Sequence, residues 1–350
     1  MSGPVLVVRD LVKRFPVRRG LGASGRQVHA VDGVSLEVAR GEVLALVGES
    51  GSGKSTVARC IARLLEPTSG QVLLMGTDVT HLSRHALRPM RRHLSMVFQD
   101  PNSSLDPRMT CGRIVAEPLR VTRRVRGREL DDRVTDLFRQ VGLRSELRFR
   151  YPHELSGGQR QRVGVARALS LDPDLLIADE PLSALDVSVQ ASVLNLMADL
   201  QRERGFSMLF ITHNLSVVEF LADRVAVMYL GRIVEQTSRE QVFGDPQHPY
   251  TQALLSAAPN PDPVAQRSRR RIVLEGDLPS PIDPPAGCHF HTRCPLAIDR
   301  CREEPPQLRG VTSAEHLVSC HLVTEEAGAP HIADAPPALS PGRVGHGICP

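Results

Sequence analysis

One stretch of the chain constrains its fold more than any other. Residues 48–55 read GESGSGKS and directly follow the apolar run EVLALV of residues 42–47, while residues 54–65 have the composition of a helix. A short apolar run before a glycine-rich turn indicates a buried strand, so the unit reads strand, loop, helix. Glycines allow unusual dihedrals and a close backbone approach, which lets the N–H groups of a loop surround a polyanion. The sequence therefore predicts an α/β core with a phosphate-binding loop.

The loop fits the pattern G-x-x-x-x-G-K-[S/T], in which each residue type has a chemical task. Lys54 is expected to reach the β- and γ-phosphates and Ser55 to ligate Mg²⁺. The helix that follows adds the positive end of its dipole. A chance match in a chain of this composition has a probability of about one in a hundred, and a glycine-rich turn without a ligand is the alternative. The predicted phosphate-binding residues are Gly48, Ser50, Gly51, Gly53, Lys54, Ser55 and Thr56.

Further apolar runs extend the predicted core. Residues 175–178 and 208–211 read LLIA and MLFI, and such runs separated by helices are typical of parallel strands covered on both faces. Valine and leucine recur at helical spacing over residues 189–200, which predicts one apolar helix face. The apolar runs at residues 5–8 and 34–38 indicate an antiparallel β layer instead.

The expected domain limits follow the composition. Residues from about 83 to 170 are rich in helix formers, which predicts a helical insertion inside a nucleotide-binding domain of residues 1–245. Prolines and clustered cysteines mark a C-terminal region of residues 246–325, and residues 326–350 are predicted to be a disordered tail. The predicted fold class is α/β. It is a P-loop NTPase with a mainly parallel sheet, an antiparallel β layer, a helical insertion and a small Cys-containing C-terminal appendage.

Two carboxylates follow the second apolar run. Asp179 and Glu180 stand where a parallel strand would end, and ligands collect at that edge of such a sheet. Asp179 is expected to hold Mg²⁺ through water, and Glu180 to act as general base on the attacking water. An acidic pair after a strand is as often a helix N-cap, so the functional interpretation depends on the phosphate loop in the same chain.

Charge and hydropathy limit the partners. The net charge is +4 and no stretch reaches the roughly 18 apolar residues of a membrane span. We therefore expect a cytosolic protein that does not bind nucleic acid and that relies on other subunits wherever a membrane is crossed. A solvated surface is the favoured interpretation of the clustered arginines. They are Arg120, Arg123, Arg124, Arg126 and Arg128.

A second predicted anion-binding motif, at residues 155–162, points to a protein family. Residues 155–162 read LSGGQRQR, where free N–H groups, a hydroxyl and a helix dipole would meet. One chain does not need two such devices for one nucleotide. The sequence resembles the ATP-binding subunits of ABC transporters over residues 5 to about 325. The resemblance implies that this signature binds the γ-phosphate held by the opposite subunit. Its residues here are Ser156, Gly157, Gly158 and Gln159.

Other motifs of the family occur in the expected order. Gln99 matches the Q-loop, which the resemblance implies contacts Mg²⁺ and water and touches the membrane subunit. Asp186 matches the D-loop at the dimer interface, and His213 matches the switch histidine near the γ-phosphate. Phe15 is similar to the aromatic residue that stacks on adenine in the family, and an ordinary core phenylalanine is the alternative. The catalytic residues are thus predicted to be Glu180, His213, Lys54 and Gln99.

Details outside these motifs resemble the branch that imports oligopeptides, dipeptides or nickel. They are QDPNSSLDPR at residues 99–108, HPYTQALL at residues 248–255 and GCHFHTRCP at residues 287–295. The resemblance implies a second, similar ATPase subunit in a heterodimer, two transmembrane permease subunits and an extracytoplasmic substrate-binding protein. It also implies a peripheral position at the cytoplasmic face of the membrane.

Four late cysteines form the pattern C-x5-C-x6-C-x18-C. Four thiolates suit a [4Fe–4S] cluster or zinc, and the short C-x2-C pairs of many zinc sites are absent. The resemblance favours the [4Fe–4S] cluster, with zinc or no metal as alternatives. The predicted ligands are Cys288, Cys294, Cys301 and Cys320.

The sequence also allows two functions of other classes. The first is a soluble ABC ATPase that acts outside transport, but such proteins usually carry two ATPase domains or long coiled coils, and this chain has one set of motifs and no heptad run. The second is an ATPase regulated by metal or redox state, with the cysteine cluster as its sensor.

Overall fold

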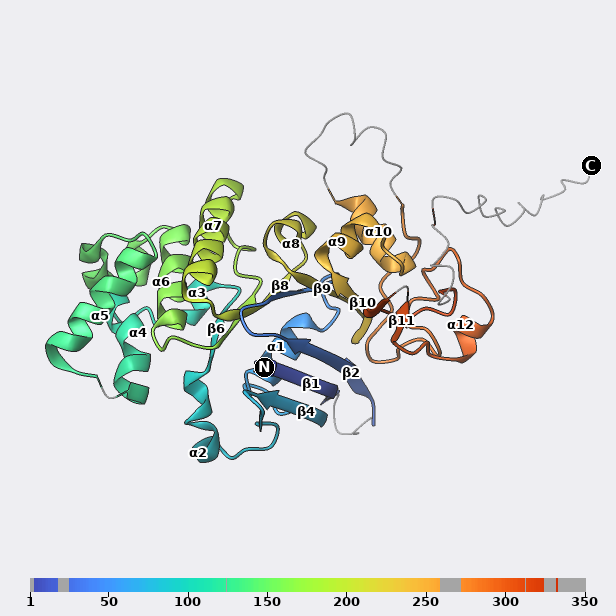
Figure 1. Cartoon of the computed structure of the whole chain (residues 1–350), viewed down its shortest axis with the longest axis horizontal. Helices are drawn as coiled ribbons and strands as arrows, with labels where there is room; N and C mark the ends of the chain where they lie inside the picture. The colour runs from blue at the N-terminus through green and yellow to red at the C-terminus, as the bar shows by residue number, and fades with distance from the viewer. Residues whose placement is uncertain are drawn as a thin grey trace, which may run out of the picture.

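The structure is a computed structural model that describes residues 3–17, 25–123, 125–258, 272–311, 313–323 and 332. Its strands form a four-stranded sheet in the order β2-β1-β4-β5 and an eight-stranded sheet in the order β11-β12-β10-β9-β3-β8-β7-β6. The two sheets are joined through the helix that follows the phosphate loop (Figure 1). In the part of the chain that is described, no helix is long and apolar enough to cross a membrane.

The centre of the larger sheet is parallel, as the apolar runs predict. Strands β9, β3, β8, β7 and β6 pair in parallel register. Every residue of β3, β7 and β8 is buried, because helices or the second sheet cover both faces. The five strands are β3 (Val43–Val47), β6 (Leu94–Val97), β7 (Leu175–Asp179), β8 (Ser207–Thr212) and β9 (Arg224–Tyr229).

The same sheet continues into the C-terminal region. Strand β10 (Arg232–Ser238) pairs antiparallel with β9 and then with β12 (Ser313–Val318), which in turn pairs with β11 (Arg309–Val311). The late segment with the cysteines is therefore tied to the edge of the main sheet by backbone hydrogen bonds.

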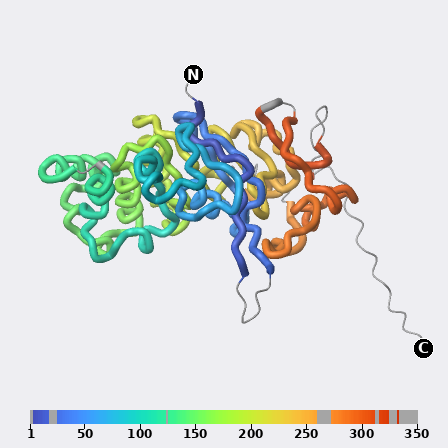
Figure 2. Tube along the Cα trace, turned by 90° about the horizontal axis from the view of Figure 1, so that it is seen from below, coloured from blue at the N-terminus to red at the C-terminus, as the bar shows by residue number. Residues whose placement is uncertain are grey.

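The smaller sheet is the antiparallel layer predicted for the N-terminal part. Strand β1 pairs with β2 on one side and with β4 on the other. Seen from below, its blue strands cross the middle of the molecule between the green helices and the orange to red C-terminal region (Figure 2). The strands are β1 (Leu6–Pro16), β2 (Gln27–Val38), β4 (Ser69–Leu74) and β5 (Thr77–Asp78).

A group of helices with its own apolar core lies on the side of β6 and β7 (Figure 1). On α7, Val193 and Leu200 are buried while Val189 and Leu196 pack partly buried against this core, so the predicted apolar face is confirmed. The group comprises α3 (Pro101–Ser104), α4 (Cys111–Pro118), α5 (Gly127–Gln140), α6 (Gly157–Leu169) and α7 (Val187–Arg204). The other helices are α1 (Lys54–Ile61), α2 (Arg84–Leu87), α8 (Leu215–Leu221), α9 (Arg239–Gly244), α10 (Pro249–Ala257) and α12 (Arg300–Glu303).

The C-terminal region packs on the opposite side through aromatic rings. Tyr229 of β9, Tyr250 of α10 and Phe290 are almost fully buried and meet edge to face or tilted, with ring centroids 4.7 to 5.5 Å apart. Such pairs stabilise a core beyond the area they bury. The tail predicted for residues 326–350 lies, apart from Ile332, outside the described residues.

Candidate functional site

The phosphate loop connects β3 to α1 and needs its glycines. Gly53 has a φ of 104°, and a Cβ there would lie 2.1 Å from the carbonyl oxygen of Ala30. A Cβ on Gly48 would lie 2.1 Å from the carbonyl oxygen of Met228. These approaches are far shorter than van der Waals contact, so only glycine fits at the two positions. The neighbouring strands thereby hold the loop in one shape.

Lys54 begins α1 and turns back into the loop. Its ammonium group donates hydrogen bonds to the carbonyl oxygens of Gly48 and Glu49, each at 2.8 Å, and lies 3.3 Å from the hydroxyl of Ser52. Burial lowers the pKa of Lys54, while the charges of nearby carboxylates oppose that shift. A buried ammonium beside a cradle of backbone groups fits a polyphosphate, whose oxygens are stronger acceptors than carbonyls. The loop therefore fits ATP.

Ser55 and Asp179 form the second part of the site. The Ser55 hydroxyl donates a 2.7 Å hydrogen bond to Oδ1 of Asp179, which ends β7 and is 2% exposed. Burial raises the pKa of Asp179, and the hydrogen bond from Ser55 opposes that shift. Hydroxyl and carboxylate oxygens are the ligands that Mg²⁺ prefers, and a divalent ion would compensate the buried charge. The pair fits Mg²⁺ and would hold it next to the phosphates.

Glu180 lies at the meeting point of three strand ends. Its Oε2 accepts a 3.2 Å hydrogen bond from the Gln99 side-chain amide, and its Oε1 lies 3.4 Å from Nδ1 of His213. Gln99 follows β6, Glu180 follows β7 and His213 follows β8, so one edge of the parallel sheet delivers all three. A pocket of about 90 Å³ opens beside Glu180 and His213. The arrangement suits a base that takes a proton from water.

The remaining residues of the loop lie where the sequence predicts them. Ser50 and Gly51 are exposed at the turn, and Gly51 has a φ of 83°. Thr56 lies half-buried in the first turn of α1. Phe15 is half-buried in β1, with the Lys13 ammonium 4.9 Å from its ring centroid. No contact of Phe15 tests adenine stacking, which stays a prediction.

The signature residues are not brought to the phosphate loop of the same chain. Ser156 caps α6, which lies among the helices at the left of Figure 1, away from α1. Ser156 and Gln159 form a reciprocal capping box, with hydrogen bonds of 3.3 and 3.0 Å. A Cβ on Gly158 would come within 2.4 Å of Val189 on α7, whereas on Gly157 it would meet only Leu185, at 3.5 Å.

The D-loop residue lies at the same surface. Asp186 is exposed, precedes α7, and makes no side-chain hydrogen bond as its N-cap. The phosphate loop before α1 and the signature at the start of α6 are thus two separate places on one molecule (Figure 1).

Two residues that the sequence did not predict reach the phosphate loop from the C-terminal region. The backbone N–H of Glu49 donates a 2.9 Å hydrogen bond to the Tyr250 hydroxyl, and Nη1 of Arg293 lies 2.9 Å from Oε2 of Glu49. These partners are 201 and 244 residues away along the chain. Nothing in a single sequence indicates a contact over such a distance.

The four late cysteines gather in the C-terminal region without forming a metal site. The N–H of Cys288 donates a 2.8 Å hydrogen bond to the carbonyl oxygen of Cys301. Burial, with smaller contributions from the other thiols, raises the pKa of Cys294 to about 12 and that of Cys320 to about 11. Within the described ranges, no three His, Cys, Asp or Glu side chains are placed to hold a metal ion, so neither zinc nor a cluster is supported there.

Comparisons with known proteins agree with the geometry. The family described as "ABC transporter" matches residues 31–183, and "Oligopeptide/dipeptide transporter, C-terminal region" matches residues 234–301. The chain is 52% identical to a probable peptide ABC transporter ATP-binding protein, y4tS, of Sinorhizobium fredii, over 97% of this chain and 95% of that protein. It is 51% identical to the oligopeptide transport ATP-binding protein AppF of Bacillus subtilis, over 91% of this chain and 97% of AppF.

A further relative and a solved structure extend the comparison. The dipeptide transport ATP-binding protein DppF of Haemophilus influenzae is 49% identical, over 91% of this chain and 97% of DppF. The ATP-binding cassette MJ0796, solved as a dimer in a post-hydrolysis state with ADP and Pi, superposes with a TM-score of 0.60 at 30% identity. That match covers 67% of this chain and 98% of the cassette. The relatives are transport proteins, which favours transport over an ATPase that acts outside it.

The chain therefore belongs to the family of ABC transporter ATP-binding proteins, in the group that carries the oligopeptide/dipeptide transporter C-terminal region, and it is an ATPase.

Proposed function

We propose that this chain hydrolyses ATP to energise the import of oligopeptides or dipeptides, and that Glu180 is the general base. The observation that carries the catalytic part is the position of the Glu180 carboxylate between Gln99 and His213, beside the pair of Ser55 and Asp179. The peptide cargo is supported by the names of relatives that are about half identical along nearly the whole chain.

The residues divide the work in the following way. Lys54 and the loop N–H groups hold the β- and γ-phosphates, while Ser55, Asp179 and Gln99 position Mg²⁺. Bound Mg²⁺ supplies neutralisation of the charge that develops on the phosphates. Glu180 orients a water molecule and takes its proton as the oxygen attacks phosphorus, and His213 supports the γ-phosphate.

The signature serves a second site. The N–H groups at the start of α6, together with Ser156 and Gln159, would bind the γ-phosphate of an ATP molecule held by a facing ATPase subunit. Asp186 lies at the same surface, next to that subunit. We propose a heterodimer in which each chain completes the site of the other.

The other partners are proposed to be two transmembrane permeases and an extracytoplasmic substrate-binding protein. This chain is then a peripheral subunit at the cytoplasmic face, with an ATP-binding domain of residues 1–245, a helical insertion near residues 83–170 and a C-terminal region of residues 246–325. Gentle solubilisation tests the assembly. We expect this chain to co-purify with membrane-spanning proteins, and a free chain at every stage would contradict the proposal.

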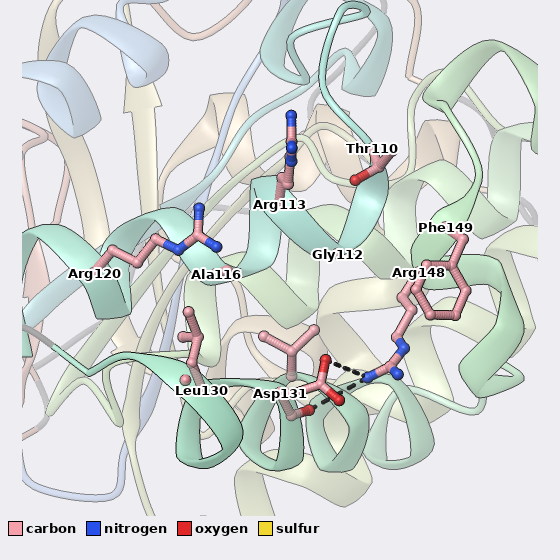
Figure 3. A pocket seen from close by; sticks show the side chains of 11 residues that line it. Thr110, Gly112, Arg113, Ala116, Arg120, Leu130, Asp131, Arg148 and Phe149 are labelled. Carbon is pink, nitrogen blue, oxygen red and sulfur yellow. Dashed lines mark hydrogen bonds and ion pairs between the residues drawn. The ribbon is translucent and has the colours of Figure 1, made fainter.

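A groove on the helical group is the proposed permease contact. It measures about 330 Å³ and lies between α4 and α5, with Arg113 and Arg120 over one wall and Phe149, 66% exposed, beside Arg148 at the other end (Figure 3). Arg148 is already paired with Asp131 at 2.8 Å. The groove follows the Q-loop along the chain, so a segment seated there would act on Gln99 through α3 and α4.

The proposed occupant is a cytoplasmic segment of a permease that carries acidic residues beside an apolar one, since the groove offers arginines and an exposed ring. Reversing the charge of Arg113 and Arg120 to Glu should weaken co-purification with the permeases and leave ATP binding intact. Unchanged assembly would contradict this contact.

The [4Fe–4S] prediction on Cys288, Cys294, Cys301 and Cys320 also stays a proposal. Its support is the resemblance of the cysteine pattern alone, because no three His, Cys, Asp or Glu side chains in the described part of the chain are placed to hold a metal ion. Anaerobic purification followed by iron and sulfide analysis tests it. We expect about four iron and four sulfide per chain, and a chain free of both would contradict it.

A further inference from the structure

Glu49 stands out among the residues of the phosphate loop because the C-terminal region holds both its backbone and its side chain. Its N–H donates a 2.9 Å hydrogen bond to the Tyr250 hydroxyl. Nη1 of Arg293 donates hydrogen bonds to the Glu49 carboxylate, at 2.9 Å to Oε2 and 3.3 Å to Oε1.

The hydroxyl of Tyr250 is held rigidly. The ring is fully buried at the start of α10, with centroids 4.7 Å from Tyr229 and 5.5 Å from Phe290. The N–H of Tyr250 also donates a 3.0 Å hydrogen bond to Nδ1 of His248, which caps the helix. A fixed acceptor of this kind sets the orientation of the peptide between Gly48 and Glu49, the first of the loop.

The negative charge of the Glu49 carboxylate is unfavourable for phosphate binding at this position. It belongs to the loop that surrounds the phosphates, and its charge acts on the ammonium of Lys54. An uncompensated negative charge there would repel a polyphosphate. Arg293 compensates it, and the Arg293 side chain is only 11% exposed, with its guanidinium 5.9 Å from the Tyr229 ring centroid. The Glu49 side chain is 29% exposed, so the pair is partly shielded from water and is screened less than a fully exposed pair.

We propose that Tyr250 and Arg293 are positioning residues of the ATP site, which makes the C-terminal region part of the nucleotide-binding machinery. Arg293 neutralises Glu49, and Tyr250 fixes the first peptide of the loop. Both act through Glu49. Leu278 of the C-terminal region also lies beside the loop, 3.8 Å from the place where a Cβ on Gly51 would stand. The inference rests on the phosphate loop binding ATP.

A double-mutant cycle of Arg293→Gln and Glu49→Gln tests the role of Arg293 in the purified full-length chain, with the Kd for MgATP measured by titration calorimetry. Arg293→Gln should raise the Kd about 10-fold, the effect of one unpaired charge at a partly shielded site. Glu49→Gln alone should leave the Kd unchanged or lower it, and the double variant should return to within about 2-fold of the wild type. Arg300→Gln is the matched control, because it removes an exposed arginine paired with Glu304 in the same region.

Tyr250→Phe tests the second contact, since it keeps the ring and removes the acceptor. In the assembled complex we expect KM for ATP to rise several-fold while kcat stays within about 2-fold. A folded Arg293→Gln chain with an unchanged Kd would overturn the proposal. So would a weakened Arg293→Gln chain that Glu49→Gln fails to rescue, because that result would assign Arg293 a packing role. Failure of the wild-type chain to bind MgATP would overturn the proposed function and this inference together.

Discussion

At Glu180 the backbone adopts a conformation that a glutamate rarely takes, with a φ of 45°. Left-handed backbone costs a residue with a Cβ about 1–2 kcal/mol, so the surrounding sheet must impose it. The N–H of Glu180 donates a 3.0 Å hydrogen bond to the carbonyl oxygen of Ile211 on β8, which fixes the turn. Strained residues of this kind gather at functional sites. Here the turn carries the carboxylate from the end of β7 to a position between Gln99 and His213.

The glycines of the phosphate loop can be tested one by one. Gly53→Ala should abolish detectable ATP binding, because its Cβ would meet a carbonyl oxygen at 2.1 Å. Gly76→Ala is the matched control, since Gly76 has a φ of 76° but no atom within 4 Å of an added Cβ. The control should cost about 1–2 kcal/mol of unfolding free energy and leave ATP binding intact. Titration calorimetry and urea unfolding measure the two effects, and equal behaviour of the variants would contradict the steric argument.

Asp179 illustrates a conflict between stability and function. Burial raises its pKa above the unfolded value, so the ionised carboxylate weakens the fold as pH rises through the raised pKa. Asp179→Asn removes the charge and keeps an oxygen for the Ser55 hydroxyl. At pH 7 the free energy of unfolding of the variant should be higher than that of the wild type, and this gain should shrink as the pH falls.

Urea unfolding at several pH values measures the gain, and ATP hydrolysis should be lost in the same variant. The exposed Asp199→Asn is the control and should show no such trend. A variant of Asp179 that is less stable than the wild type at pH 7 would show that the charge is compensated within the fold.

Among the helices and strands, those that a local pattern of apolar residues determines could be predicted from the sequence. The strands β3, β7 and β8 are continuous apolar runs because both of their faces are covered. Asp179, Glu180 and His213 lie at or directly after the ends of β7 and β8, as these runs predict. Strands β10 to β12 were not predicted, since their pattern depends on distant partners. Glu235 looks like a surface residue in the sequence, yet it is fully buried in β10.

The burial of Glu235 depends on partners from two other elements. Its Oε1 accepts a hydrogen bond from the N–H of Gln247 and lies 2.8 Å from Nε2 of His316, and its Oε2 accepts one from the N–H of His248. These partners come from the start of α10 and from β12. Contacts between elements far apart in sequence decide this part of the fold, and a single sequence does not record them.

The start of α10 carries a prediction of its own. Burial lowers the pKa of His248 to about 4, and its neutral Nδ1 accepts the N–H of Tyr250 at 3.0 Å. The neutral imidazole therefore contributes stability that is fully present above about pH 6.5 and is lost as pH falls toward 4. His248→Asn keeps an N-cap acceptor that does not titrate.

The unfolding free energy of the wild type should drop by about 3 kcal/mol between pH 6.5 and 4 from this residue alone. The His248→Asn variant should lose correspondingly less over the same range. His81→Asn, at an exposed histidine, is the control. Parallel pH profiles for all three proteins would contradict the assignment.

At the scale of the whole molecule, the phosphate loop and the signature lie on separate parts of one chain. The sequence alone revealed both devices and, through the resemblance, their division between two subunits. The sequence did not reveal that the C-terminal region forms hydrogen bonds with Glu49 of the phosphate loop. The late segment of this chain thus contacts the phosphate loop from one side, and the other side of the ATP site is proposed to come from a partner.

The decisive test of Glu180 as the general base is the rate of ATP hydrolysis by an assembled complex with Glu180→Gln, in which the general base of the partner ATPase is also replaced. Single-turnover hydrolysis then reports the site of this chain alone. If Glu180 is the base, MgATP should still bind and the rate should fall at least about 100-fold relative to the complex that keeps wild-type Glu180. A rate close to that of the complex with wild-type Glu180 would show that another group activates the water, and would contradict the mechanism.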